Sequence, residues 1–334
     1  MDQPGGLATT ASGATRATPL AERLRGGALE GMPFLILAAL CLATALATDR
    51  FLTPVNLGNV LLQASVMAVL AMGMTYVMVS GGFDISVGST VAASGCAAAA
   101  VMLEAGPLAG VGAGVALGVG VGLVNGLLVT RLDLNPFIAT LGTMVVVRGF
   151  VLLLTGGRPI DGEEGLPEAF ILYGRGRFLG IPWIVWTPVA LFAVLWWILH
   201  RTSYGKRLYA TGGNREAAFL AGIDTVRTRA SAYVWCGAMA GVAGVMLAAR
   251  LESGQPTAGE FYELMAIAAV VIGGASLYGG EGKLHKTIAG VLIIVVLANA
   301  LNLMNVDSYW QRIAVGVVIV AAAAADQVRR RRRG

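Results

Sequence analysis

Charged residues are scarce in this sequence. Lys, Arg, Asp and Glu make up 13% of its 334 residues, whereas hydrophobic residues make up 56%. Soluble domains carry about 25% charged residues, so these few charges cannot cover a water-exposed surface. The composition therefore excludes an ordinary soluble protein and predicts a polytopic membrane protein.

Cysteine and histidine are also rare. Cys41, Cys96 and Cys236 lie apart inside apolar stretches, with no spacing typical of a metal site or a disulfide framework. We interpret them as small buried hydrophobic residues. The two histidines, His200 and His285, stand alone at predicted span ends. Because no Ser-His-Asp set or ligand cluster emerges, we expect no bound metal, and an integral membrane enzyme is disfavoured.

A phosphate-binding loop is missing as well. Such a loop needs Gly, four residues and then Gly-Lys-Ser/Thr. Gly282-Lys283 comes nearest, but Leu277 replaces the first glycine and Leu284 replaces the hydroxyl residue. We therefore expect no nucleotide hydrolysis by that route and no cofactor on this chain. Active transport would draw its energy from a partner protein or an ion gradient.

The net charge of +5 does not indicate a nucleic-acid partner. The basic residues concentrate in one loop, His200–Arg229, and in the tail Arg329–Arg333. Basic residues next to a membrane set its topology and contact anionic lipid. We therefore expect membrane lipid, and no nucleic acid, as their contact.

What the sequence does contain is a series of apolar segments. A helical span needs about 20 predominantly apolar residues, and ten candidates predict an all-α protein with both termini on one side of the membrane. The candidates are Pro33–Thr48, Leu57–Ser80, Ile85–Leu103, Leu108–Thr130, Pro136–Thr155, Trp183–Leu199, Ala230–Ala249, Leu264–Tyr278, Thr287–Leu303 and Trp310–Ala325.

The distribution of charge orients these spans. The N-terminal arginines, the basic loop and the basic tail share one side, and most acidic loop residues share the other. The positive-inside rule places both termini and the loop in the cytoplasm. We therefore divide the chain into a disordered cytoplasmic lead (residues 1–30), a transmembrane domain (31–326) with a cytoplasmic loop (200–229), and a basic cytoplasmic tail (327–334).

One predicted span carries a stripe of glycines. A glycine at every fourth residue draws a nearly continuous line down one helix face, which lets a neighbouring backbone approach closely. We expect packing within one subunit, and a subunit interface is the alternative. The stripe consists of Gly106, Gly110, Gly114, Gly118, Gly122 and Gly126.

Two glycine-rich breaks interrupt the apolar segments, GGFDISVGS (81–89) and VIGGASLYGGEGK (271–283). Their similarity indicates an internal duplication, and transporters often place such paired breaks near the pathway. Polar residues lie in or near these spans, and each has two interpretations. Asp84 caps a helix or faces the pathway, and Asn125 and Asn135 bond another helix or a sugar hydroxyl. Arg148 needs a carboxylate or backbone carbonyls, of which we favour a structural ion pair, or it faces the pathway.

The centre of the basic loop reads GGNREAAFLAGI (212–223). Glu216-Ala217-Ala218, three residues and then Gly222 resemble the start of the coupling motif of binding-protein-dependent ABC importers, although the Ile-x-Leu-Pro ending of its longest form is absent. An ordinary loop that only sets topology is the alternative. The small alanine side chains would let a short helix enter a cleft on the ATPase. Gly222 is typical of a helix C-terminus.

Further strings strengthen this resemblance. FLTPVNLGNVL (51–61), VMVSGGFDISVGS (77–89), NPFIATLGT (135–143) and RGFVLLLTGGRPI (148–160) occur in one order with the two motifs above. Together they resemble the permease subunit of ribose/xylose/galactoside-type ABC sugar importers over about residues 51–326.

This resemblance implies the ABC-importer permease fold in a bacterial cytoplasmic (inner) membrane, and import of a monosaccharide or similar polyol. It implies a second permease copy or a paralogue, a cytoplasmic ATPase that holds ATP and Mg, and an extracytoplasmic sugar-binding protein. It further implies coupling to the ATPase through Arg215, Glu216, Ala217, Ala218 and Gly222. Our candidates for the pathway or its gate are Gly81, Gly82, Asp84, Ser86, Asn135, Arg148, Gly273 and Gly274.

A gradient-driven secondary transporter is the rival hypothesis. It would need no ATPase, but proton coupling generally uses carboxylates within the membrane. Few such carboxylates occur in the predicted spans, which favours the importer.

Overall fold

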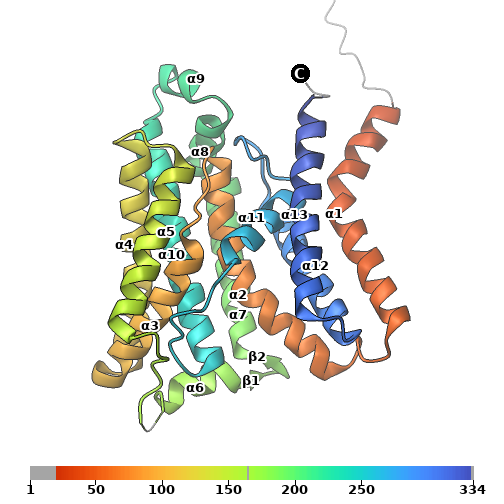
Figure 1. Ribbon diagram of the computed structural model, residues 1–334. Coiled ribbons are helices and arrows are strands. Elements are labelled where there is room, and N and C mark those ends of the chain that lie inside the picture. Colours follow the sequence, from red (N-terminus) through yellow and green to blue (C-terminus); the bar gives the residue numbers. More distant parts are fainter. Residues whose placement is uncertain (1–19, 164, 332–334) are drawn as a thin grey trace, which may run out of the picture.

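A computed structural model describes residues 20–163 and 165–331, and it shows a bundle of helices with one small hairpin (Figure 1). The antiparallel hairpin pairs β1 (Arg177–Phe178) with β2 (Ile181–Pro182). The helices are α1 (Leu20–Ala47), α2 (Pro54–Val79), α3 (Val87–Ala105), α4 (Pro107–Thr130), α5 (Pro136–Thr155), α6 (Glu168–Arg175), α7 (Trp183–Arg201), α8 (Ser203–Gly213), α9 (Arg215–Leu220), α10 (Thr225–Leu251), α11 (Tyr262–Ile272), α12 (Leu284–Leu303) and α13 (Ser308–Arg331).

Seven of these helices are long and apolar enough to cross a membrane, namely α2, α3, α4, α5, α7, α10 and α12. Shorter apolar segments lie in α1, α11 and α13, so each predicted span has a helical counterpart. Of the predicted lead, residues 1–19 lie outside the described residues, and α1 begins at Leu20.

The structure corrects the eighth predicted span, Leu264–Tyr278. Its helix α11 has only 11 residues and ends at Ile272. At about 1.5 Å per residue it covers roughly half of a hydrocarbon core about 30 Å thick. The helix ends because Gly274 takes a positive φ of 86°, so the chain turns into an irregular link before α12.

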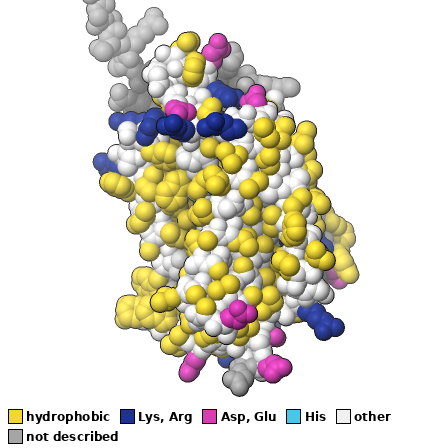
Figure 2. Space-filling model, turned by 90° about the vertical axis from the view of Figure 1, so that its left-hand side faces the viewer, with side chains coloured by type: hydrophobic (Ala, Val, Ile, Leu, Met, Phe, Trp, Pro, Cys, Tyr) yellow, Lys and Arg dark blue, Asp and Glu magenta, His cyan; other side chains and the backbone are white. Residues whose placement is uncertain are grey.

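The two ends of the bundle differ. The start of α1 and the end of α13 lie at the end that carries α8 and α9, here the α9 end, whereas β1 and β2 mark the opposite hairpin end (Figure 1). On the face shown in Figure 2, Lys and Arg side chains form a band near the α9 end, and hydrophobic side chains cover the flank below it. This pattern supports the predicted cytoplasmic location of the α9 end.

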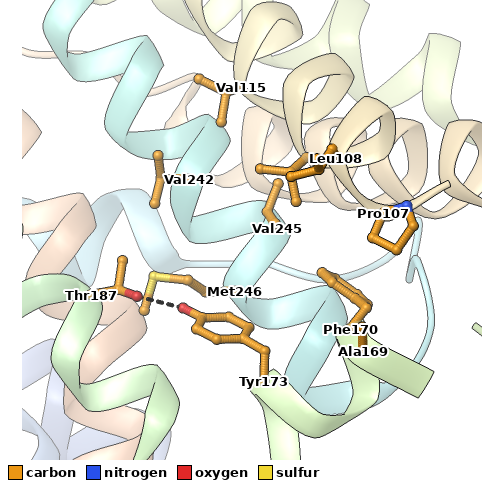
Figure 3. Close-up of a pocket in the computed structure, with 11 residues that line it drawn as sticks. Pro107, Leu108, Val115, Ala169, Phe170, Tyr173, Thr187, Val242, Val245 and Met246 are labelled. Carbon is orange, nitrogen blue, oxygen red and sulfur yellow. Dashed lines mark hydrogen bonds between the residues drawn. The ribbon is translucent and has the colours of Figure 1, made fainter. Parts of the chain in front are cut away.

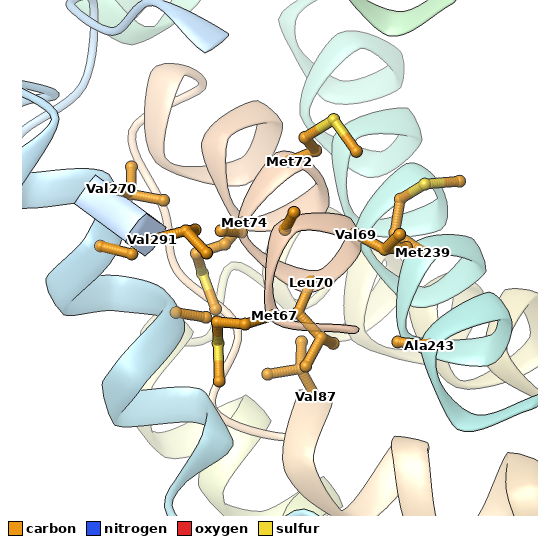
Figure 4. Packing of buried hydrophobic residues seen from close by; sticks show 14 of the residues in the cluster. Met67, Val69, Leu70, Met72, Met74, Val87, Met239, Ala243, Val270 and Val291 are labelled. Carbon is orange, nitrogen blue, oxygen red and sulfur yellow. The ribbon is translucent and has the colours of Figure 1, made fainter. Parts of the chain in front are cut away.

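Helix α2 forms the centre of the bundle. Its side chains Val69, Leu70, Met72 and Met74 are at most 1% exposed. Figure 4 shows this helix between α10, which contributes Met239, and the segments α11 and α12 on its other side. A movement of α2 would therefore disturb packing on both of its sides.

The glycine stripe of α4 packs inside the chain. A Cβ atom at Gly118 would lie 2.3 Å from the Gly237 carbonyl oxygen of α10, and one at Gly237 would lie 2.2 Å from the Gly118 oxygen. Gly114 makes a similarly close approach to the Ser94 oxygen of α3. This confirms the predicted packing within one subunit from Gly110 to Gly126, because only glycine lets these backbones touch. Gly106 precedes α4 and meets open space.

Candidate coupling site

Helix α9 is a short, capped helix that protrudes from the bundle (Figure 1). The Asn214 side chain accepts a hydrogen bond from the Ala217 amide at 2.9 Å, which satisfies one of the free N–H groups at the helix start. At the other end Gly222 has a φ of 82°. The Gly222 amide donates to the Phe219 oxygen at 2.9 Å, and the Ile223 amide donates to the Ala218 oxygen at 3.0 Å. Gly222 therefore ends this helix as predicted.

The side chains of α9 divide between the protein and its surface. Ala218 is buried against the chain, whereas Ala217 is exposed. Phe219 and Leu220 are 67% and 79% exposed. These two large apolar residues were missed in the sequence, although their position directly after the two alanines in a polar loop was a usable signal. Exposed apolar side chains that lie together mark an interaction surface.

Arg215 contacts the protein's own chain. Its Nη1 lies 3.2 Å from Asp133 Oδ1, in the link between α4 and α5. Both side chains are well exposed, so the pair contributes about 0–1 kcal/mol. Glu216 is exposed in the first turn of α9, where a carboxylate is favourable next to the free N–H groups. Of the predicted coupling set, Arg215, Glu216, Ala217 and Gly222 are exposed, and Ala218 is buried.

Helix α8 joins α9 to the bundle. A Cβ atom at Gly205 would lie 1.9 Å from the Leu199 oxygen, so the turn from α7 into α8 is tight. The Tyr209 hydroxyl donates a hydrogen bond to the Gly282 carbonyl in the link between α11 and α12. Burial raises the pKa of Tyr209 to about 12, so the hydroxyl keeps its proton and stays a donor at neutral pH.

Asp84, Ser86 and Asn125 form a buried polar cluster between α2, α3 and α4. Asp84 Oδ1 accepts hydrogen bonds from the Ser86 amide at 2.9 Å and the Ser86 hydroxyl at 2.6 Å. Asn125 Nδ2 donates to Asp84 at 3.1 Å and to Ser86 Oγ at 2.8 Å. All three are at most 1% exposed. The carboxylate therefore stabilises the turn just before α3, and no side-chain cap hydrogen bond forms at the first turn of that helix.

Arg148 is bound by backbone carbonyls. Its Nη1 donates to the Pro256 oxygen at 2.6 Å and to the Ala258 oxygen at 2.9 Å, both in the link between α10 and α11. Of the two kinds of partner expected for Arg148, the structure therefore shows backbone carbonyls rather than the favoured ion pair, because this irregular link leaves oxygens that need donors. Arg148 holds the link against α5.

The remaining candidates for the pathway or its gate also contact other parts of the protein. Asn135 is an exposed N-cap at the start of α5, and its Oδ1 accepts from the Phe137 amide at 2.9 Å. Gly81 has a φ of 83°, and its carbonyl oxygen lies 3.5 Å from Arg229 Nη2. A Cβ atom at Gly82 would lie 2.5 Å from the Tyr233 hydroxyl, and one at Gly273 would lie 2.6 Å from a backbone oxygen of α12.

A pocket of about 350 Å³ lies between α4, α6, α7 and α10, toward the hairpin end (Figure 3). Its lining is apolar apart from Tyr173 and Thr187, whose hydroxyl oxygens are 2.6 Å apart. A sugar would bury several hydroxyls there without partners, which is costly. The pocket is therefore not assigned to sugar binding.

The apolar bundle defines a polytopic membrane protein, and the helix α9 protrudes from it at one end (Figure 1). Residues 56–323 match the family described as "Branched-chain amino acid transport system / permease component". The chain therefore belongs to this family of multi-pass, inner-membrane transport permeases, and it is a transport subunit.

Curated relatives confirm the resemblance to sugar importers. The ribose import permease protein RbsC of Bacillus subtilis (strain 168) is 46% identical over 289 residues, which cover 86% of this chain and 89% of the relative. RbsC of Escherichia coli (strain K12) is 41% identical over 294 residues, with 87% and 92% covered. The L-arabinose ABC transporter permease protein AraH of Azospirillum brasilense is 38% identical over 303 residues, with 90% and 88% covered. No solved structure matches the chain.

Proposed function

We propose that this chain is the membrane subunit of an ATP-driven importer and that α9 docks the ATPase. The observation that carries this proposal is the exposure of Phe219 and Leu220 on a capped helix at the basic end. A permease of this family needs a partner that supplies energy, and an exposed apolar pair supplies the buried centre of such an interface.

The substrate we propose is a monosaccharide, with ribose and L-arabinose as the first candidates. The family description mentions branched-chain amino acids. The relatives that match over nearly their full length are named for ribose and L-arabinose import. We give these relatives more weight, because their alignments cover more of the chain than the family match over residues 56–323 does.

The proposed assembly has two permease copies, either identical or paralogous, with the pathway between them. The ATPase, which holds ATP and Mg, binds at the α9 end. The sugar-binding protein docks at the hairpin end, where Glu252 and Arg175 form an ion pair. Membrane lipid contacts the exposed apolar faces of helices such as α5.

We further propose that the glycine breaks gate this pathway. The buried polar residues act indirectly, since their hydrogen bonds keep the neighbouring links in place, and Asn135 acts at the start of α5. The proposed gating residues are Gly81, Gly82, Asp84, Ser86, Asn135, Arg148, Gly273 and Gly274.

Reconstitution tests the transport proposal. Proteoliposomes would contain the chain, its candidate ATPase and its candidate binding protein, with labelled ribose or L-arabinose outside. We expect uptake to require internal ATP and both partners and to survive ionophores that collapse ion gradients. Uptake without the ATPase that disappears with an ionophore would identify a secondary transporter, and uptake of leucine alone would overturn the sugar proposal.

Docking is tested by copurification of the ATPase. Replacing both Phe219 and Leu220 with Ser should lower the bound ATPase at least tenfold, because the interface loses its apolar centre. Leu52→Ser is the control, since Leu52 is similarly exposed but lies outside the α9 end. Equal ATPase binding in both variants would contradict docking through α9.

A further inference from the structure

Three glycine pairs from distant parts of the chain meet at the α9 end. Gly81-Gly82 follows α2, Gly212-Gly213 ends α8, and Gly279-Gly280 lies in the link between α11 and α12. We call the contact between Gly81, Gly212, Gly279 and Gly280 the glycine joint. The sequence showed all three pairs, but it gave no signal that they touch.

The contacts in the joint are between bare backbones. The Gly280 amide donates a hydrogen bond to the Val79 carbonyl oxygen at 3.0 Å. A Cβ atom at Gly212 would lie 1.8 Å from that same oxygen and 2.8 Å from the Gly280 nitrogen. One at Gly279 would lie 2.7 Å from both Gly81 Cα and the Gly212 oxygen. The end of α8 is therefore pressed between the end of α2 and the link that begins α12.

This geometry leaves little freedom of movement between the three segments. Side-chain contacts can absorb a small displacement by changing rotamer, whereas directly touching backbones cannot. Tyr209 adds a second connection, because its hydroxyl donates to the Gly282 carbonyl in the same link. A displacement of α8 is therefore passed to both α2 and the start of α12.

The helices that would receive this displacement, α2 and α12, lie inside the bundle. Helix α2 is the most buried of the seven spans. It is tied to α12 by Asn56 with Asn299 and, nearer the joint, by the Thr75 and Thr287 hydroxyls at 2.9 Å. Helices α2 and α12 would therefore move together when α8 is displaced.

We propose that the glycine joint is the positioning element that transmits movement of α9 to the transmembrane helices, with Gly212 as its key residue. This inference rests on the proposed function, in which the ATPase docks on α9. It concerns a different property, however: how much transport each hydrolysed ATP produces, rather than whether the ATPase binds.

Neighbouring glycines provide a matched test. Gly212 and Gly213 are both in α8, but a Cβ atom at Gly213 would have no atom within 4 Å. The complete complex in proteoliposomes would be used to measure ATPase binding, ATP hydrolysis and sugar uptake. We expect Gly212→Ala to bind the ATPase normally but to lower the sugar imported per ATP at least fivefold. Gly213→Ala should stay within twofold of the unmodified protein.

Tyr209→Phe covers the case in which Gly212→Ala fails to assemble. It removes one hydroxyl group with its hydrogen bond and keeps the ring, and we expect a twofold to fivefold lower ratio of sugar to ATP with unchanged ATPase binding. A normal ratio in Gly212→Ala overturns the proposal, as does a normal ratio in Tyr209→Phe when Gly212→Ala cannot be assembled. Failure of the unmodified chain to bind the ATPase or to use ATP would instead refute the proposed function, and the joint with it.

Discussion

Asn56 of α2 and Asn299 of α12 exchange two hydrogen bonds within the bundle. Asn56 Nδ2 donates to Asn299 Oδ1 at 3.1 Å, and Asn299 Nδ2 donates to Asn56 Oδ1 at 2.8 Å. Both residues are buried. Side-chain amides satisfy each other across two membrane helices in this way, and water is not needed.

Removal of one partner of this pair should destabilise the bundle. Asn299→Leu leaves the buried Asn56 amide partly unpaired, which costs about 1–3 kcal/mol. Thermal unfolding in detergent would show this as a lower Tm. Asn302→Leu is the control, since Asn302 lies on the same helix but is exposed. An equal Tm for the two variants would contradict the importance of the pair.

The Asp84 cluster should reject a second carboxylate. Asn125→Asp replaces the amide that donates to Asp84 and creates two buried acids, so we expect a loss of about 3–5 kcal/mol. The yield of folded protein by size-exclusion chromatography would report it. The same exchange at the exposed cap, Asn135→Asp, should be tolerated, because Asp and Asn cap helices about equally well. Normal yield of Asn125→Asp would show that the cluster is open to water or to another partner.

The glycine stripe should be sensitive on one face of α4 only. Gly118→Ala places a Cβ atom against the Gly237 oxygen, and overpacking of this kind costs about 1–3 kcal/mol. Gly120→Ala meets open space and should be neutral or slightly stabilising, since alanine is the better helix former. Tm values in detergent compare the two. A Gly120→Ala variant as unstable as Gly118→Ala would indicate that α4 packs differently.

The ion pair of Arg215 with Asp133 should respond to charge reversal. Arg215→Asp places two carboxylates together and should weaken the attachment of α9 by about 1 kcal/mol or less, because the pair is exposed. Copurification should then show less bound ATPase for Arg215→Asp. The double variant Arg215→Asp with Asp133→Arg should restore ATPase binding in the same measurement. If the double variant binds as weakly as the single one, Arg215 contacts the ATPase itself.

The order and character of the helices could be read from the sequence because each depends on local composition. Long apolar runs such as Pro136–Thr155 became helices with the same bounds. The capping role of Gly222 was also local, since a glycine that follows a helical segment readily takes a positive φ. In contrast, Ala218 was expected on the docking surface and is buried, because the direction of its side chain depends on how α9 is attached to α8 and α10.

The sequence by itself determined that this chain is a membrane protein, where its apolar helical segments lie, and which short segment is the coupling candidate. These properties follow from apolar run lengths, from charge asymmetry and from contiguous motifs. The tertiary structure alone decided that Gly212 meets Val79 and Gly280, and that Asn56 pairs with Asn299 across 243 positions. Contacts between distant residues depend on how whole helices pack, and no local pattern records which glycine backbone will touch another.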